Sequence, residues 1–411
     1  MIVRLAGKSL RVWLGGTLLS GVCLTPYTPV QAQGTAAAPP RTGSNITVHP
    51  LSPGPLDGQI AYVTARLLQK YHYLRQPFDD AVSGKFLERY LEVLDPQHLH
   101  FLQSDLADFE VYRTNLDHLT LPSAPANPSA KPATVIFNRF MQRLQQRIAF
   151  NENLLKNEKF NFDADERVTV VRKDAPYPKD IDEAKQLWRD RLRYEYLQEK
   201  LAKVEAKKKA AAAEERADSA SRTNAESPAT TKADALKPKK SDAEEIVDTL
   251  IHRYRRNLHT FADWDSDDVL QIYLTALARV YDPHSDYFGH SALDSFAITM
   301  NLSLFGIGAE LMSEDGYCTI NRLLPGGPAA KSKKIKEKDR IIAVAQSNQP
   351  PVDVVDMSLN KAVQLIRGPK GTEVTLTIIP AGGPDSESTR ISLIRDEIKL
   401  EDQEAKAKLI E

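Results

Sequence analysis

One short stretch decides the fold of the last third of the chain: Phe305-Gly306-Ile307-Gly308-Ala309. Its two glycines bracket an apolar residue just before a run of strand-forming residues, Gly308 to Met312. Glycine lets the backbone turn so that successive N–H groups point into one concavity, which can hold an anion without a charged side chain. The stretch therefore predicts a site for the α-carboxylate of a peptide at the mouth of a strand.

Around this stretch, short β-rich runs alternate with Gly, Pro and Asn turns, which predicts one small α/β domain over residues 297–398. One helix is expected from Leu359 to Ile366, opened by Ser358. An extended peptide would pair with the first strand and place its last side chain between that strand and this helix, in a pocket that is apolar in this sequence. The expected strands are Gly308 to Met312, Tyr317 to Leu323, Ile341 to Val344, Val374 to Ile379 and Ile391 to Ile394.

The preceding residues, 56–296, carry the three- and four-residue apolar spacing of amphipathic helices. Ser104-Asp105 is expected to cap one helix, and Ser266 with Asp267 and Asp268 to cap the last one, which Asp282-Pro283 ends. The sequence therefore predicts a mainly α domain. The apolar faces expected to pack include Ile60, Val63, Leu67, Tyr71 and Leu74, then Ile136, Phe140, Leu144 and Ile148, then Trp188, Leu192, Leu197 and Leu201, and finally Ile246, Leu250, Tyr254 and Leu258.

Two polar stretches flank or interrupt this helical pattern. Residues 33–55 are rich in small residues and proline and predict a flexible leader. Residues 203–244 are of low complexity and predict a solvated insert, whose first half could prolong a helix that begins near Ile181.

The N-terminus has the composition of an export signal over residues 1–32. Basic residues precede the apolar run Val12 to Leu24, and Val30-Gln31-Ala32 is a small-residue cleavage site. Lipidation at Cys23 is the alternative. Removal of the signal would leave Cys318 as the only cysteine, so no internal disulfide is expected.

Charge and motif spacing exclude several classes of function. The chain has 54 Lys plus Arg against 55 Asp plus Glu, so no one-sign field favours nucleic acid, and a protein or peptide partner is expected instead. His98 and His100 lie in no metal-binding spacing, and neither a metal nor a cofactor is expected. His284-Ser285-Asp286 are consecutive, whereas the partners of a catalytic triad approach from different directions.

The order of several motifs resembles the PDZ domain and the N-terminal helical domain of tail-specific (carboxy-terminal processing) proteases. The resemblance covers most of the chain from Leu56 to Glu411, apart from the low-complexity insert. The fold class it implies is multidomain: a mainly α N-terminal domain followed by a small α/β PDZ domain. The motifs are the Phe305 stretch, Gly326-Gly327-Pro328-Ala329-Ala330-Lys331, Lys338-Asp339-Arg340-Ile341, Leu365-Ile366-Arg367-Gly368-Pro369-Lys370-Gly371-Thr372, Leu94-Asp95-Pro96-Gln97-His98 and Asp282-Pro283-His284-Ser285-Asp286-Tyr287.

The resemblance also implies an activity. Members of that family are exported serine endopeptidases, of the periplasm or cell envelope, that grip apolar C-termini of unfolded or tagged proteins and cut them with a Ser–Lys dyad. The dyad lies in a domain after the PDZ domain, and residues 399–411 resemble the junction into it, so no catalytic residue is carried over. Phe305, Gly306, Ile307 and Gly308 are carried over as the carboxylate-binding residues, and Val363 and Ile366 as residues of the pocket for the last side chain.

Two other roles remain open at this stage. A chain that ends at Glu411 would be a non-catalytic PDZ adaptor that binds protein C-termini. An adaptor protein docking on the helical stripes is a second hypothesis for the N-terminal domain. A chymotrypsin-like catalytic domain before the PDZ domain is excluded, because helical sequence without the expected serine motif fills that region.

Overall fold

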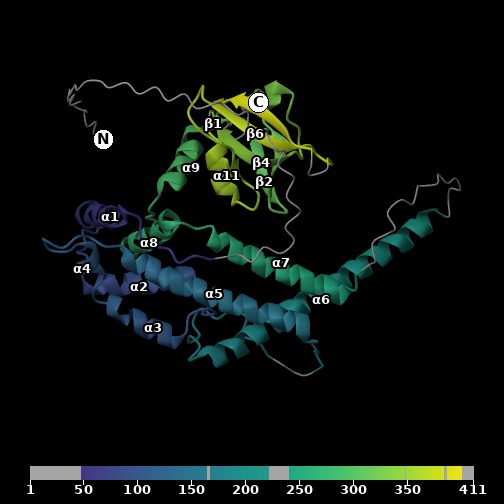
Figure 1. The fold of residues 1–411 in the computed structure, drawn as a ribbon. Helices are drawn as coiled ribbons and strands as arrows, with labels where there is room; N and C mark the ends of the chain where they lie inside the picture. Colours follow the sequence, from purple (N-terminus) through teal and green to yellow (C-terminus); the bar gives the residue numbers. More distant parts are fainter. Residues whose placement is uncertain (1–47, 164–166, 222–239, 348, 384–386, 400–411) are drawn as a thin grey trace, which may run out of the picture. The chain divides into compact units, whose positions relative to one another are not determined.

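The structure is a computed structural model that describes residues 48–163, 167–221, 240–347, 349–383 and 387–399. It contains a helical domain followed by a β-rich domain (Figure 1). The predicted signal, most of the predicted leader, residues 222–239 of the low-complexity insert and all but the first residue of the predicted junction lie outside the described residues. None of the helices within these ranges combines the length and the hydropathy that crossing a bilayer requires.

The helical domain is built around one long helix, α5. Its residues Ile136, Phe140, Leu144 and Ile148 are all buried, as their four-residue spacing predicts. Helices α6, α7 and α8 pack against α5, and the predicted apolar face of α7 is likewise buried. The bounds are α1 Asp57–Tyr71, α2 Asp80–Leu94, α3 Gln103–Phe109, a 3₁₀ turn Glu110–Tyr112, α4 Leu116–Thr120, α5 Lys131–Asn157, α6 Ile181–Ser221, α7 Asp242–Ala262, α8 Ser266–Tyr281 and α9 His290–Asn301.

The buried face of α1 is not the one that the sequence predicts. Val63, Leu67 and Tyr71 are 53%, 52% and 70% exposed, whereas Ala61 and Ala65 are fully buried. Alanine side chains allow the backbone of α1 to approach α8, which it contacts. The prediction that the larger apolar stripe packs into the core is therefore wrong.

Two helix starts also differ from prediction. The carboxylate of Asp265, not Ser266, caps α8 by accepting the amides of Asp267 and Asp268. Leu102, not Ser104, is the N-cap of α3. Helix α6 continues to Ser221, so the first half of the low-complexity stretch prolongs the helix, as the sequence allowed. A further helix, α9, follows α8, which is therefore not the last one before the strands.

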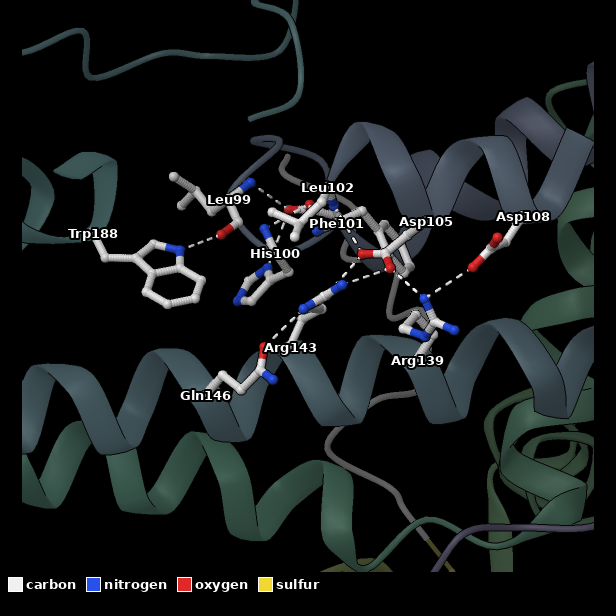
Figure 2. Close-up of polar contacts among 11 residues, drawn as sticks. Leu99, His100, Phe101, Leu102, Asp105, Asp108, Arg139, Arg143, Gln146 and Trp188 are labelled. Carbon is white, nitrogen blue, oxygen red and sulfur yellow. Dashed lines mark hydrogen bonds and ion pairs between the residues drawn. The ribbon is translucent and has the colours of Figure 1, made fainter. Parts of the chain in front are cut away.

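Asp105 is a fully buried carboxylate that joins α3 to α5. Figure 2 shows Arg139 and Arg143 rising from α5 towards it, and Arg143 donates through Nε and Nη2, both at 2.8 Å. Asp105 also accepts a hydrogen bond from the amide of Leu102 at 2.9 Å and forms an ion pair with Arg139. Burial by itself would raise the pKa of Asp105, but these donors outweigh burial and lower it below its ordinary value.

A second buried carboxylate, Asp95, organises the loop between α2 and α3. Its oxygens accept the backbone amides of Leu99, His100 and Phe101 at 2.8 to 3.0 Å, so loop amides without helical partners are satisfied. The Leu99 carbonyl accepts the indole N–H of Trp188, which fixes α6 to the same loop (Figure 2).

The β-rich domain has a five-strand path, β2-β3-β4-β6-β7, with β5 paired to β4 and a separate pair of β1 with β8. All the pairings are antiparallel, and Gly306 of β1 lies opposite Asp396 of β8. The five predicted strands are present within a few residues of their predicted bounds. The elements are β1 Ser303–Gly306, β2 Ala309–Glu314, β3 Tyr317–Leu323, α10 Pro328–Ser332, β4 Arg340–Gln346, β5 Val352–Asp353, α11 Leu359–Ile366, β6 Glu373–Ile379, β7 Thr389–Ile394 and β8 Asp396–Lys399.

Strands and α11 enclose a single apolar cluster. It includes Ile320 and Cys318 of β3, Val374 and Leu376 of β6, and Ala362 of α11. Helix α11 begins after Ser358, as predicted, and contacts β2 and β4 (Figure 1). The sequence does not predict β1, β5, β8 or the short helix α10.

We predict that Asp105→Asn destabilises the chain by about 2–3 kcal/mol at pH 7, because two arginines lose a buried anionic acceptor. Since the pKa of Asp105 is lower in the folded state, its stabilisation is complete above the ordinary value of 3.8 and disappears as the pH falls through the lowered value. Urea unfolding of variant and wild type, measured from neutral to acidic pH, should therefore converge in acid.

Asp108→Asn is the matched control, because Asp108 also pairs with Arg139 but its side chain is 63% exposed. The control should cost under about 0.5 kcal/mol. Equal losses in the two variants at pH 7 would show that burial of Asp105 is irrelevant.

Candidate functional site

The loop singled out by the sequence joins β1 to β2 at the edge of the sheet. Phe305 and Gly306 end β1, while Ile307 and Gly308 form the turn before Ala309 starts β2. The side chain of Phe305 is 45% exposed and that of Ile307 is buried in the apolar cluster. The four residues are thus contiguous, but the side chains of Phe305 and Ile307 lie in different environments.

Gly308 is the position in this loop that requires glycine. Its φ is +72°, and a Cβ there would lie 2.8 Å from Cα of Gly327 and 3.1 Å from Cδ1 of Ile398. Gly306 has no positive φ, and a Cβ on it would meet no atom closer than 3.4 Å. The structural requirement therefore falls on the second glycine of the pair.

The direction of the loop amides follows from the carbonyls, which are fixed. Ile307 O accepts the amide of Ala329 at 2.8 Å, and Gly308 O accepts the amide of Leu324 at 2.9 Å. In a trans peptide, the N–H points away from the C=O of the same unit. The amides of Gly308 and Ala309 therefore point away from the segment Leu324 to Ala329, and within the described residues the Gly308 amide has no acceptor.

Strand β2 presents an open edge beside this loop. It pairs with β3 on one side and ends the strand order, so its other edge has no strand partner among the described residues. An open edge offers main-chain donors and acceptors to an added strand. Helix α11 contacts β2, so the helix lies beside the strand that has the open edge.

The two predicted pocket residues lie differently on α11. Ile366 is 3% exposed and, like Ala362, belongs to the apolar cluster. Val363 is half-buried. Ile366 therefore lies inside the domain, whereas part of the Val363 side chain stays accessible at the surface of the helix.

Arg367 is a residue near the loop that sequence reasoning missed. It is the C-cap of α11, and its Cγ lies 3.8 Å from the position of a Cβ on Gly306. Burial lowers the pKa of its guanidinium from 12.5, which still leaves it charged at neutral pH. Its signal in the sequence was a lone arginine between an apolar helix and Gly368-Pro369, a pattern with no specific chemistry.

His98 and His100 of the helical domain each contact other side chains or the backbone of that domain. His98 is stacked on Tyr177 with ring centroids 3.8 Å apart, and its Nδ1 lies 2.5 Å from the Ala175 carbonyl. His100 Nδ1 lies 3.1 Å from the Asp95 carboxylate. Burial lowers the pKa of His100, opposed by the hydrogen bond to Asp95.

The Ser285 hydroxyl donates to Asp282 at 3.4 Å, and His284 Nδ1 also lies against Asp282, at 3.1 Å. This local turn at the end of α8 lacks the serine–histidine contact that acyl transfer needs.

One group of possible metal ligands occurs among the described residues: Asp80, Asp117 and His118. Asp80 and His118 are exposed, and Asp117 accepts the hydroxyl of Ser83 at 3.1 Å. Exposed acidic clusters of this kind are common surface features, and this one shows no arrangement that selects an ion.

Comparison with known proteins assigns both domains. The profile of the Tail specific protease N-terminal domain matches residues 64–291, and that of the PDZ domain matches residues 296–379. The tail-specific protease of Haemophilus influenzae is 32% identical over 94% of this chain and 48% of its own length. The carboxy-terminal processing protease CtpA of Bacillus subtilis is 38% identical over 29% of this chain and 24% of its own.

A solved PDZ domain of a carboxy-terminal protease from Vibrio cholerae, in complex with a peptide, is 49% identical over 24% of this chain and all of its own, with a TM-score of 0.24. The chain thus spans about half or less of the length of the two curated relatives. It belongs to the tail-specific protease family and carries that family's N-terminal domain followed by a PDZ domain.

Proposed function

We propose that this chain selects protein substrates by binding their C-termini in the groove between β2 and α11. The observation that carries the proposal is that the N–H groups of Gly308 and Ala309 point away from the segment Leu324 to Ala329, next to the open edge of β2. The amides would hold the terminal carboxylate, and the edge of β2 would pair with the peptide backbone. Half-buried Val363 would contact an apolar last side chain.

We also propose that the protein to which this region contributes is an exported serine endopeptidase. In that reading a Ser–Lys dyad, in a domain after the PDZ domain, cuts chains that the groove has captured. Tethering a substrate through its C-terminus raises its effective concentration near the active site to the millimolar range that short flexible connections give. The relatives named above support protease function; the signal-like N-terminus supports export to the periplasm or cell envelope.

The main prediction concerns the peptide carboxylate. A peptide that ends in a small apolar residue should bind the chain as the free acid, and about 10- to 100-fold more weakly as the C-terminal amide, because charge-assisted hydrogen bonds to the loop are lost. Fluorescence anisotropy with the two peptides measures this ratio. Acetylation of the N-terminus is the control and should not change the affinity; equal binding of acid and amide would rule out a carboxylate site.

The same assay tests the pocket. Val363→Asp should weaken binding of the apolar-ended free acid about tenfold or more, since the carboxylate would repel the peptide terminus and remove apolar contact. Gln364→Asp adds the same charge at the next, exposed position of α11 and should change the affinity less than about twofold. Equal effects would mean that charge near α11, not contact at Val363, governs binding.

A non-catalytic PDZ adaptor is the alternative reading. The intact mass of the protein isolated from cell-envelope or periplasmic fractions, together with its N-terminal sequence, separates the two. The protease reading expects a mass well above that of a 411-residue chain and an N-terminus at Gln33. A mass at or below that of the 411 residues would favour the adaptor, and a retained Met1 would contradict cleavage of the signal.

A role in recruiting an adaptor protein is supported by one surface of the helical domain. The α1 stripe, defined as Val63, Leu67 and Tyr71, is exposed along a hollow of about 460 Å³. Apolar stripes of this kind are typical docking sites for another protein. Sedimentation of the native protein should show a complex that Leu67→Glu abolishes and Lys85→Glu, on the exposed face of α2, preserves; a monomeric wild type would refute recruitment.

A further inference from the structure

Arg395, between β7 and β8, is a buried arginine that the proposed binding groove does not use directly. It is 2% exposed, and among the described residues it has no carboxylate partner. Burial lowers the pKa of its guanidinium. A buried charge of this kind is costly unless its hydrogen-bond donors are all satisfied, so its acceptors show what it holds in place.

All five N–H groups of this guanidinium have an acceptor. Nε donates to Ile366 O at 2.8 Å, and Nη2 donates to Leu365 O at 3.2 Å and to Gln346 Oε1 at 2.6 Å. Nη1 donates to Thr372 Oγ1 at 2.9 Å and to Glu373 O at 3.2 Å. The side chain therefore joins the last turn of α11 to the end of β4 and the start of β6.

The two acceptors on α11 are carbonyls that no further helical turn can satisfy. A cation at this end of a helix is favoured by the helix dipole as well as by the hydrogen bonds. Gln346 reinforces the junction, because its Nε2 donates to Leu365 O at 2.5 Å. Arg395 and Gln346 thus hold the end of α11 that carries Ile366, near the half-buried Val363.

The backbone of Arg395 leads directly to residues 305–308, which are proposed to bind the peptide carboxylate and are called the carboxylate loop below. The next residue, Asp396, lies opposite Gly306 in the pair of β8 with β1. The Arg395 amide donates to Thr372 O, and its carbonyl accepts the amide of Gly371, both at 2.8 Å. One residue is therefore fixed to the strand that enters the loop and, through its side chain, to the helix on the other side of the groove.

Gly368 leaves room for this arrangement. A Cβ on Gly368 would lie 2.9 Å from both Cζ and Nε of Arg395, while its φ is not in the left-handed region. A substitution at Gly368 therefore displaces the guanidinium by contact alone and provides an independent perturbation of the same junction.

We infer that Arg395 is a positioning residue that sets the spacing between α11 and the carboxylate loop, and so determines how strongly the groove discriminates among C-terminal side chains. The inference rests on the proposed capture of C-termini. Arg395 touches no peptide atom in this scheme; it acts through the main chain of Leu365 and Ile366.

The first experiment measures hydrogen exchange of the α11 amides in the unliganded chain. Arg395→Lys, Arg395→Gln and Gly368→Ala should each speed exchange across Val363 to Arg367 at least fivefold, with Lys the mildest of the Arg395 changes because it keeps one cationic donor group. Arg390→Gln is the matched control, because Arg390 is an exposed residue of β7. Unchanged exchange in the Arg395 variants would overturn the inference, whether or not any peptide binds.

The second experiment measures anisotropy with two free-acid peptides that differ only in a terminal valine or glycine. Arg395→Gln should weaken binding of the valine peptide about tenfold and of the glycine peptide less than twofold. The ratio of the two affinities should therefore fall strongly. Arg395→Lys should restore part of the ratio, and Arg390→Gln should leave it intact.

A general loss of stability would not change the ratio, because it lowers the folded fraction equally for both peptides. Ile391→Val, a buried change in β7, controls for this effect. A ratio retained in folded Arg395→Gln overturns the inference. Failure of wild type to bind either peptide instead overturns the proposed function, while the exchange result still decides whether Arg395 positions α11.

Discussion

The carboxylate loop depends on a backbone contact that leaves no room for a side chain. Gly308 and Gly327 approach so closely that a Cβ on either would lie within 3 Å of the other's Cα. This contact brings the carbonyls of Ile307 and Gly308 to the amides of Ala329 and Leu324. Because the carbonyls are held on that side, the amides face the open edge of β2, and α10, which supplies the Ala329 amide, helps to fix the loop.

Both domains use a buried charged side chain to satisfy backbone groups without partners near helix ends, but the sign of the charge differs. Where α2 ends and α3 begins, backbone amides lack partners, and the buried carboxylates of Asp95 and Asp105 accept them. Where α11 ends, carbonyls lack partners, and the buried guanidinium of Arg395 donates to them. The charges of Asp105, in the first turn of α3, and of Arg395, at the end of α11, are the ones that the helix dipole favours at those positions. Asp95 instead follows the end of α2 and satisfies loop amides.

The sequence predicts those features that arise from local spacing. The strands of the PDZ domain, α11 with Ser358 before it and the buried faces of α5 and α7 follow from periods of two or about 3.6 residues. The pairing of β1 with β8 joins residues 90 to 96 positions apart, and no local pattern encodes it. The α1 face was mispredicted because periodicity marks the larger side chains, whereas close packing on α8 selects Ala61 and Ala65.

For the site, the glycine at Gly308 and the strand edge could be predicted, because glycine before a strand lets the backbone turn there. The different environments of Phe305, Ile307, Val363 and Ile366 could not, since all are apolar in a sequence and only the tertiary fold divides them. Arg395 was equally hidden. Its acceptors are mostly main-chain carbonyls, which every residue possesses.

The buried thiol of Cys318 has a consequence for the chemistry of the PDZ domain. Burial raises the pKa of this thiol to about 11, so at pH 7 the thiolate that exchanges disulfides or reacts with alkylating agents is scarce. The folded domain thus protects this thiol from such reactions. Opening of β3 from the apolar cluster would expose an ordinary reactive cysteine, so the rate of thiol labelling reports how often the domain opens.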